Sequence, residues 1–142
     1  MIDIANVVLR IAKDAVISTY SDCEFTSDNP ESISHFPTVS VVEIDNSTYI
    51  PSLDNTYEEN HTSVAFDICV YTNKTAGKKS QAKAIMNLID TAMIKAGFIR
   101  YTVQELPNID RSIYRLGGRY KAVVSAPYTD AKGNTVHDIY RR

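Results

Sequence analysis

The stretch Gly-Lys-Lys-Ser at residues 77–80 is the part of the chain closest to a catalytic motif. It lies between a strand-like run and a helix-like run, as the phosphate-binding loop of nucleotide-using enzymes does. That loop has the pattern G-x-x-x-x-G-K-[ST], because its glycines let backbone N–H groups surround the phosphates and its hydroxyl binds magnesium. Here Thr72 occupies the first glycine position and Lys79 the hydroxyl position. We therefore predict no specific nucleotide binding, and we expect Thr75 or Ser80 to cap the helix.

The other residues that could do catalytic or metal chemistry are scattered. None of the histidines at 35, 61 and 137 is followed three or four residues later by a metal-binding residue. Cys23 and Cys69 are too few for a disulfide framework and are most simply buried apolar residues. A Cys–His catalytic pair stays open as an alternative, which an unreactive, buried thiol would exclude. The sequence predicts a protein that is not an enzyme and has no cofactor and no metal.

The net charge of −2 conceals a large asymmetry along the chain. Residues 1–73 carry two bases and twelve acids, a balance of −10, whereas residues 74–142 carry thirteen bases and five acids, a balance of +8. Such a split is typical of nucleic-acid binding or of a self-complementary assembly. The simpler alternative is that the two halves interleave in space and their charges mix. No apolar run approaches the roughly 18 residues of a membrane helix, and no signal peptide is recognisable, so we expect a soluble protein of a reducing cytoplasm.

The hydrophobic pattern predicts which elements position these residues. Apolar residues at helical spacing indicate a helix over residues 2–19 and a second helix that ends at Gly97, a left-handed cap. Alternating or β-branched runs indicate strands at residues 22–27, 38–45, 63–71, 98–106 and 112–125. The order α-β-β-β-α-β-β predicts one α+β domain over residues 1–142, with a mostly antiparallel sheet and both helices packed on one face.

The core and the last long strand can be predicted in more detail. We expect six residues to pack between the sheet and the helices: Phe66, Ile68, Ile85, Leu88, Ile89 and Tyr120. Over residues 112–125 the apolar side chains share one parity and the basic ones the other, and this register continues through Gly117-Gly118. One long strand with a glycine bulge therefore fits as well as a Gly-Gly hairpin.

Two polar segments complete the chain. Residues 46–62 read as a long turn-rich loop, and loops of this length are often functional. Tyr49, Ile50, Leu53 and Tyr57 would give the loop apolar anchors, so we expect it to be mobile in the isolated subunit and to order against a partner. Residues 128–142 form a polar C-terminal tail with a Lys-Gly-Asn turn.

Residues 57–125 resemble a family of small tail-completion, or minor capsid, proteins from tailed phages and prophages of Gram-positive bacteria. The pieces that carry the resemblance are "ENH", "VYTNK", "GKKSQAKAIM", "PNIDRSIYR" and "GRYKAVVS". The resemblance covers about half of the chain well and the N-terminal part loosely. No piece is a catalytic signature, so the similarity is one of overall pattern.

The resemblance implies an α+β tail-terminator subunit that assembles into a homo-oligomeric, hexameric ring. Such a ring caps the tail tube, stops its polymerisation and joins the tail to the head connector. The implied partners are further copies of the chain, the major tail tube protein and the head-completion protein, with no specific nucleic acid and no membrane. The implied location is the virion tail, and the host cytoplasm before assembly. A free monomer that assembles only on the tube is compatible with this role.

Charge and exposure select the candidate interface residues of such a ring. The basic candidates are Lys78, Lys79, Lys83, Arg115 and Arg119. The acidic candidates are Glu43, Asp45, Glu58 and Glu59, and the apolar ones are Tyr49, Leu53 and Tyr57. Two alternatives stay open: another head–tail connector or neck protein, and a nucleic-acid-binding module that uses the basic C-terminal half.

Overall fold

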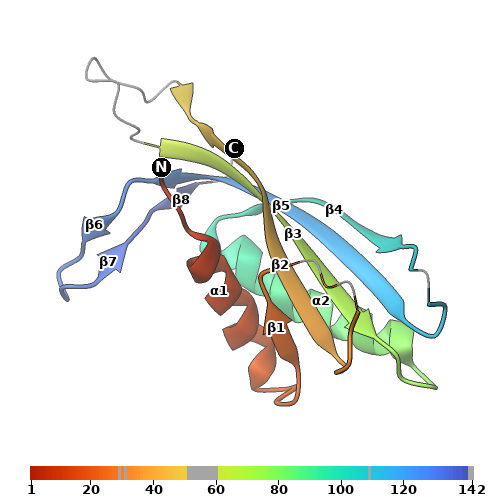
Figure 1. The fold of residues 1–142 in the computed structure, drawn as a ribbon. Helices are drawn as coiled ribbons and strands as arrows, with labels where there is room; N and C mark the ends of the chain where they lie inside the picture. The colour runs from red at the N-terminus through yellow and green to blue at the C-terminus, as the bar shows by residue number, and fades with distance from the viewer. Residues whose placement is uncertain (29, 31, 51–60, 109, 141–142) are drawn as a thin grey trace.

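The computed structural model shows a curled sheet with both helices on one of its faces (Figure 1). It describes residues 1–28, 30, 32–50, 61–108 and 110–140. The elements are α1 (Ala5–Ile17), β1 (Glu24–Thr26), β2 (Thr38–Thr48), β3 (His61–Thr72), α2 (Lys78–Ala96), β4 (Ile99–Leu106), β5 (Tyr114–Ser125), β6 (Tyr128–Thr129), β7 (Thr135–Val136) and β8 (Ile139–Tyr140). The predicted α+β class and the order α-β-β-β-α-β-β are confirmed.

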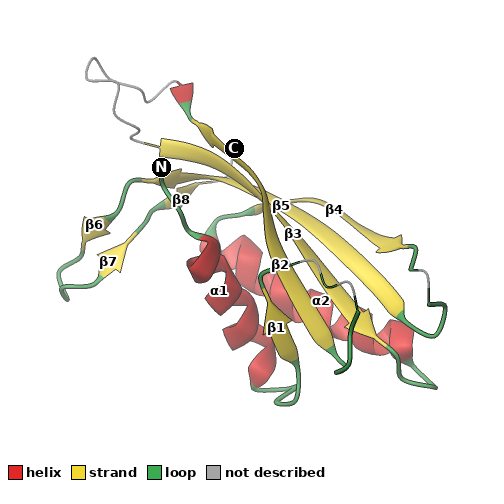
Figure 2. Cartoon of the chain, in the orientation of Figure 1, coloured by secondary structure: helices red, strands yellow, loops and turns green. Residues whose placement is uncertain are grey.

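The main sheet has the strand order β1-β2-β3-β5-β4. All of its pairs are antiparallel except that of the short β1 with β2. Strand β8 continues the β4 side of β5, where it pairs with Val123 and Val124. Because β3 and β5 are adjacent, the acidic and basic halves of the sequence meet along the middle of the sheet (Figure 2).

Helix α1 buries one residue per turn. Val8, Ala12 and Val16 are fully buried at a spacing of four residues, so they form a single stripe toward the sheet and α2. The predicted start at residue 2 was too early, because the carboxylate of Asp3 accepts a hydrogen bond from the backbone N–H of Ala5 (2.9 Å) at the helix entrance. Residues 2–4 therefore precede the helix, with Ile4 at the N-cap.

Helix α2 begins differently from the prediction. Its N-cap is Gly77 in the left-handed conformation (φ 84°), and no side chain caps the helix, so the expectation that Thr75 or Ser80 would do so was wrong. The hydroxyl of Thr72, at the end of β3, donates instead to the backbone carbonyl of Lys78 (2.8 Å) and ties the strand to the first helical turn. The predicted left-handed cap at Gly97 is confirmed, with φ 113°.

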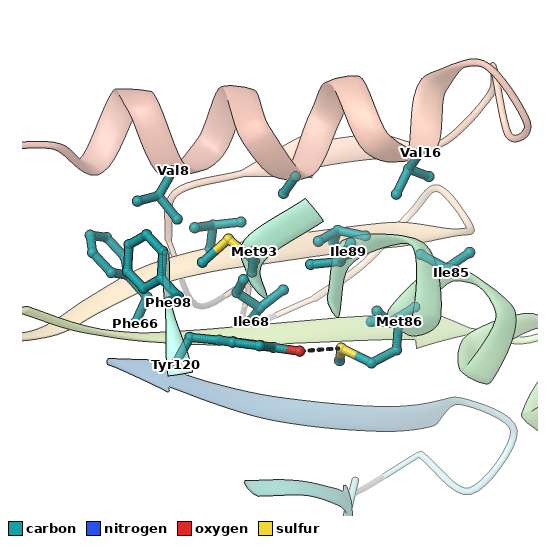
Figure 3. Packing of buried hydrophobic residues seen from close by; sticks show 14 of the residues in the cluster. Val8, Val16, Phe66, Ile68, Ile85, Met86, Ile89, Met93, Phe98 and Tyr120 are labelled. Atoms are coloured by element: carbon teal, nitrogen blue, oxygen red, sulfur yellow. Dashed lines mark hydrogen bonds between the residues drawn. The ribbon is translucent and has the colours of Figure 1, made fainter. Parts of the chain in front are cut away.

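The buried stripe of α2 matches the prediction except at one flank. Ile85 and Ile89 are fully buried as expected, but Leu88 is only partly buried, and Met86 takes the place assigned to it. The sulfur of Met86 lies 4.0 Å from the hydroxyl of Tyr120 on β5 (Figure 3). An unbranched methionine fits this narrow space against the sheet, which the helical periodicity alone did not reveal.

The core lies between the helices and one face of the sheet. Val8 and Val16 reach down from α1, and Phe66, Ile68 and Tyr120 reach up from β3 and β5 (Figure 3). Phe66 packs edge-on against Phe98, with ring centroids 6.2 Å apart. Of the six predicted core residues, only Leu88 is not fully buried.

Gly117 and Gly118 lie within one continuous strand. The pairing of β5 with β3 runs without a register shift from Tyr114 to Ser125, so β5 has neither a hairpin nor a bulge at the glycines. Close packing explains why both residues are glycine. A Cβ atom on Gly117 would lie 2.5 Å from Leu106, and one on Gly118 would lie 3.0 Å from Tyr120.

The predicted loop at 46–62 is strand at both ends. Asn46, Ser47 and Thr48 pair with Val64, Ser63 and Thr62. The hydroxyl of Thr62 contacts both the side-chain oxygen of Asn46 (2.6 Å) and the backbone carbonyl of Ser47 (2.9 Å). Polar residues therefore extend the hairpin because they form hydrogen bonds with one another across it. Mobility was predicted for the loop at residues 46–62, and residues 51–60 of that loop lie outside the described residues.

The C-terminal segment also contains short strands. β6 and β7 form a separate two-stranded hairpin, whose turn contains Gly133 at φ 81°. The carboxylate of Asp130 accepts hydrogen bonds from the backbone N–H groups of Lys132 and Asn134, both at 2.9 Å. The Lys-Gly-Asn turn is thus an Asx-type turn.

Candidate interaction surfaces

The face of the sheet opposite the helices, here called the open face, has a hollow of about 200 Å³ across its four long strands. Its lining includes Val42 and Ile44 of β2 and Leu106 of β4. The two outer long strands of the curled sheet therefore both border the same hollow. Gly117 also lines it, and the side chain of Leu106 packs against this glycine.

An ion pair occupies the middle of the open face. Asp67 and Arg119 are directly opposite each other on β3 and β5. The guanidinium binds the carboxylate through two hydrogen bonds, from Nε (2.9 Å) and from an Nη atom (3.2 Å), and these raise the pKa of Arg119. Here the acidic and basic halves of the sequence do mix. Arg119, predicted as a basic interface residue, is therefore already neutralised within its own subunit.

Arg115 lies four residues before Arg119 on β5, in a more enclosed setting. One of its Nη atoms lies 3.6 Å from the sulfur of Cys69, and its guanidinium carbon lies 5.5 Å from the ring centroid of Tyr71. Its Nε atom is buried and has no hydrogen-bond partner in the described chain. Burial also raises the pKa of Tyr71, which keeps its hydroxyl protonated beside the arginine.

Three other bases lie at one end of the sheet, around the start of α2. Lys78, Lys79 and Arg111 line a second hollow of about 260 Å³, together with Arg115. The predicted candidates Lys78, Lys79 and Arg115 are thus brought together, and Arg111 joins them although it was not a candidate. Lys83, the remaining basic candidate, is exposed on α2 and does not line this hollow.

The two described acidic candidates on β2 differ from each other. Glu43 is opposite Phe66, which places it at the margin of the helix-covered face, and it is half-buried. Burial raises the pKa of its carboxyl, with a further contribution from Asp3 and Asp45. Asp45 is exposed, beyond a shift in the strand register, and accepts a hydrogen bond from Ser47 (3.0 Å). Asp45 is therefore the better placed of the two to meet another molecule.

The remaining candidates lie at the end of the β2–β3 hairpin or outside the described residues. Tyr49 is half-buried, its backbone N–H donates to the carbonyl of His61 (2.9 Å), and its ring meets that histidine edge-on at 6.5 Å. It therefore packs on its own chain. Four candidates lie outside the described residues: Leu53, Tyr57, Glu58 and Glu59.

Both lateral edges of the sheet have strand residues with no described pairing partner, a feature that sequence analysis missed. Strand β4 pairs only with β5, and its exposed side chains include Ile99 (40%), Tyr101 (64%) and Val103 (37%). On the other side, β1 covers only Thr38–Ser40 of β2, so no described strand pairs with the outer edge of residues 41–48. The alternation within residues 98–106 gave no signal of this, because strand order is a property of the whole sheet.

The cysteines and histidines form no catalytic pair in the described part of the chain. Burial, with Asp22 and Glu24 nearby, raises the pKa of the Cys23 thiol to about 12, so it remains a thiol at neutral pH. His35 contacts the backbone carbonyl of Asp22 rather than the thiol. Among the described residues there is also no group of three potential metal ligands. No described helix has the length and apolar character needed to cross a membrane.

Comparison with protein-family models and with curated protein sequences returned no match for this chain.

Proposed function

We propose that this protein is a structural subunit of a head-to-tail ring that terminates a phage tail tube. In this role the ring caps the tube, stops its polymerisation and joins the tail to the head connector. The family resemblance of residues 57–125 suggests the role. The observation that supports it most is the two sheet edges that no described strand pairs with, β4 and residues 41–48 of β2, here called the free edges.

An exposed strand edge presents unpaired N–H and C=O groups that readily pair with another chain. Proteins usually protect such edges with charges, prolines or covering segments. Strand β4 carries two such charges, Arg100 and Glu105, but it also exposes three apolar side chains over eight residues. An edge of this kind is well suited to permanent contact with a neighbour.

The two free edges differ from each other, and this difference favours a ring. One is β4, and the other is the outer half of β2, at the opposite side of the sheet. A contact between two different patches of identical subunits is heterologous, and it closes into a ring when the rotation permits. Charge complementarity between the two sides would steer and register the contact.

The test is to disrupt the gene in its phage or prophage and to image the particles by negative-stain electron microscopy. We expect tail tubes of irregular, excessive length without attached heads, and recovery when the intact gene is supplied. Tails of normal length joined to heads would refute the proposal. Tails of normal length without heads would indicate the alternative, a connector on the head side.

A further inference from the structure

The hollow at the start of α2 concentrates positive charge. Four bases line it, here called the α2 hollow: Lys78, Lys79, Arg111 and Arg115. Glu105 is the only acid in its described lining. Its walls are otherwise partly apolar, formed by Leu106, Pro107, Ile113 and Tyr114. A cavity of this composition fits a short peptide segment with a carboxylate better than it fits a free metal or an apolar ligand.

The bases of the α2 hollow are not neutralised within the described chain. None of the four lies within ion-pair distance of a described carboxylate, whereas Arg119 and Arg100 are paired with Asp67 and Asp90. The ammonium group of Lys78 donates to the backbone carbonyl of Arg111 (3.2 Å), and that of Lys79 lies 5.9 Å from the ring centroid of Tyr114.

The nearby acid Asp110 is already engaged. Its carboxylate accepts hydrogen bonds from the backbone N–H (2.9 Å) and the hydroxyl (2.7 Å) of Ser112, and these lower its pKa, with a smaller contribution from Lys78. Asp110 therefore reduces the positive field of the hollow without filling it.

The N-terminus of helix α2 adds to the positive electrostatic field of the hollow. The helix is 19 residues long, its first turn contains no acid, and no side chain caps its N-terminus. Its free N–H groups carry a partial positive charge, which favours an anion. Lys78 and Lys79 lie in this first turn, where positive charge is unfavourable in the isolated subunit. An external anion bound there would stabilise them.

We infer that the α2 hollow receives carboxylates from the acidic half of a second copy of the chain, Asp45 among them. This inference rests on the proposed ring. Residues 1–73 have a charge of −10, and Asp45 has no described ion-pair partner. Asp45 lies on β2, near one free edge, while the α2 hollow includes Glu105 and Leu106 at the end of β4, the other free edge. A heterologous contact joins two such different patches of identical subunits.

A nucleic acid is the less favoured occupant. A phosphate backbone requires a basic path that continues along the surface. On the adjacent open face, however, Arg119 is neutralised by Asp67, which interrupts such a path.

The test exchanges charges between the two sides. One variant combines Lys79→Glu with Arg111→Glu, both at exposed positions, and the other is Asp45→Lys. Self-association is measured by sedimentation equilibrium at about 0.1 M salt, where the screening length is about 10 Å, and at about 1 M, where it is about 3 Å. The matched control, Lys95→Glu with Lys132→Glu, makes the same charge change at exposed positions away from the hollow. Circular dichroism verifies the fold of each variant.

We expect the wild type and the control to associate at low salt, and the hollow variant to associate at least about tenfold more weakly. The Asp45→Lys variant weakens association in the same direction, and a mixture of the two variants recovers part of it. Unchanged association of the hollow variant, no recovery in the mixture, or a wild type that stays monomeric at millimolar concentration would overturn the inference. Tight binding of a single-stranded oligonucleotide that the hollow variant loses would also overturn it. All of these results leave the tail-length test of the proposed ring intact.

Discussion

Strands β3 and β5 present two faces of opposite character. On the helix-covered face Phe66, Ile68 and Tyr120 are fully buried and exclude water. On the open face the same strands carry the Asp67–Arg119 ion pair. Burial of apolar area stabilises by about 25 cal/mol per Å², whereas exposed ion pairs contribute little. The covered face therefore holds the subunit together, and the open face is free to differ in sequence and to serve contacts with other molecules.

The largest difference between the faces should appear on truncation of isoleucines. Ile68→Ala removes a fully buried side chain from the covered face, and we expect it to lower the free energy of unfolding by about 2–5 kcal/mol. Ile44→Ala is the matched change on the open face, where the side chain is 42% exposed, and it should cost about 1 kcal/mol or less. Denaturant unfolding measures both. Equal losses would show that the open face is also a core.

The two adjacent glycines test the same contrast within β5. In Gly118→Ala the new methyl group meets Tyr120 and Met86, which are buried and cannot move, so we expect a loss of about 1–3 kcal/mol. In Gly117→Ala the methyl group meets the end of the half-buried Leu106 side chain, which can turn away. Alanine also restricts the unfolded chain, so that change should stay within about 1 kcal/mol. A larger loss of stability in Gly117→Ala than in Gly118→Ala, measured by thermal unfolding, would contradict the assignment of Gly118 to the covered face and Gly117 to the open face.

A third prediction concerns the polar edge of the covered face. The Tyr120 hydroxyl donates to Asp90 (2.8 Å), which also binds Arg100 (3.0 Å), and burial is the main reason that the pKa of Tyr120 is raised. Tyr120→Phe removes that hydrogen bond and should cost about 0.5–1.5 kcal/mol in denaturant unfolding. Tyr114→Phe, at another buried tyrosine, removes no side-chain hydrogen bond within the described part of the chain and should cost less. A larger loss for Tyr114→Phe would mean that the Tyr120–Asp90 contact contributes nothing.

The covered face could be predicted from the sequence because burial imposes a period. The alternation of Phe66 and Ile68 and the spacing of Ile85 and Ile89 follow directly from this period. The one predicted core residue that is not fully buried is Leu88. The cap of α2 was mispredicted because its N-cap is a left-handed Gly77, which has no side chain to accept hydrogen bonds from the first N–H groups.

The candidate site could be predicted only in part. The lysines at 78 and 79 stood out by composition, but Arg111 joins them through a turn that the sequence does not place in space. The pairing of Arg119 with Asp67 depends on β3 lying beside β5, 52 residues apart in sequence. Strand order and strand edges arise from the whole sheet, so no local pattern contains them.

The smallest effect should come from Glu43, a carboxyl at the margin of the covered face. One of its oxygens is buried without a hydrogen-bond partner in the described chain, and the other lies 3.4 Å from the side-chain nitrogen of Asn46. Burial raises its pKa, so its contribution to stability is present below the pKa of about 4.3 that it has when unfolded, and is lost as the pH rises through the folded-state pKa. Glu43→Gln keeps an acceptor for Asn46 but never ionises.

The variant should therefore be more stable than the wild type at pH 7, by a margin that shrinks toward zero as the pH falls to about 4. Urea unfolding over this pH range measures the margin, and Asp14→Asn, at an exposed position of α1, is the control for a general change in net charge. A margin that is constant with pH would show that folding does not shift the pKa of Glu43, and one that grows on acidification would show that the fold stabilises the carboxylate.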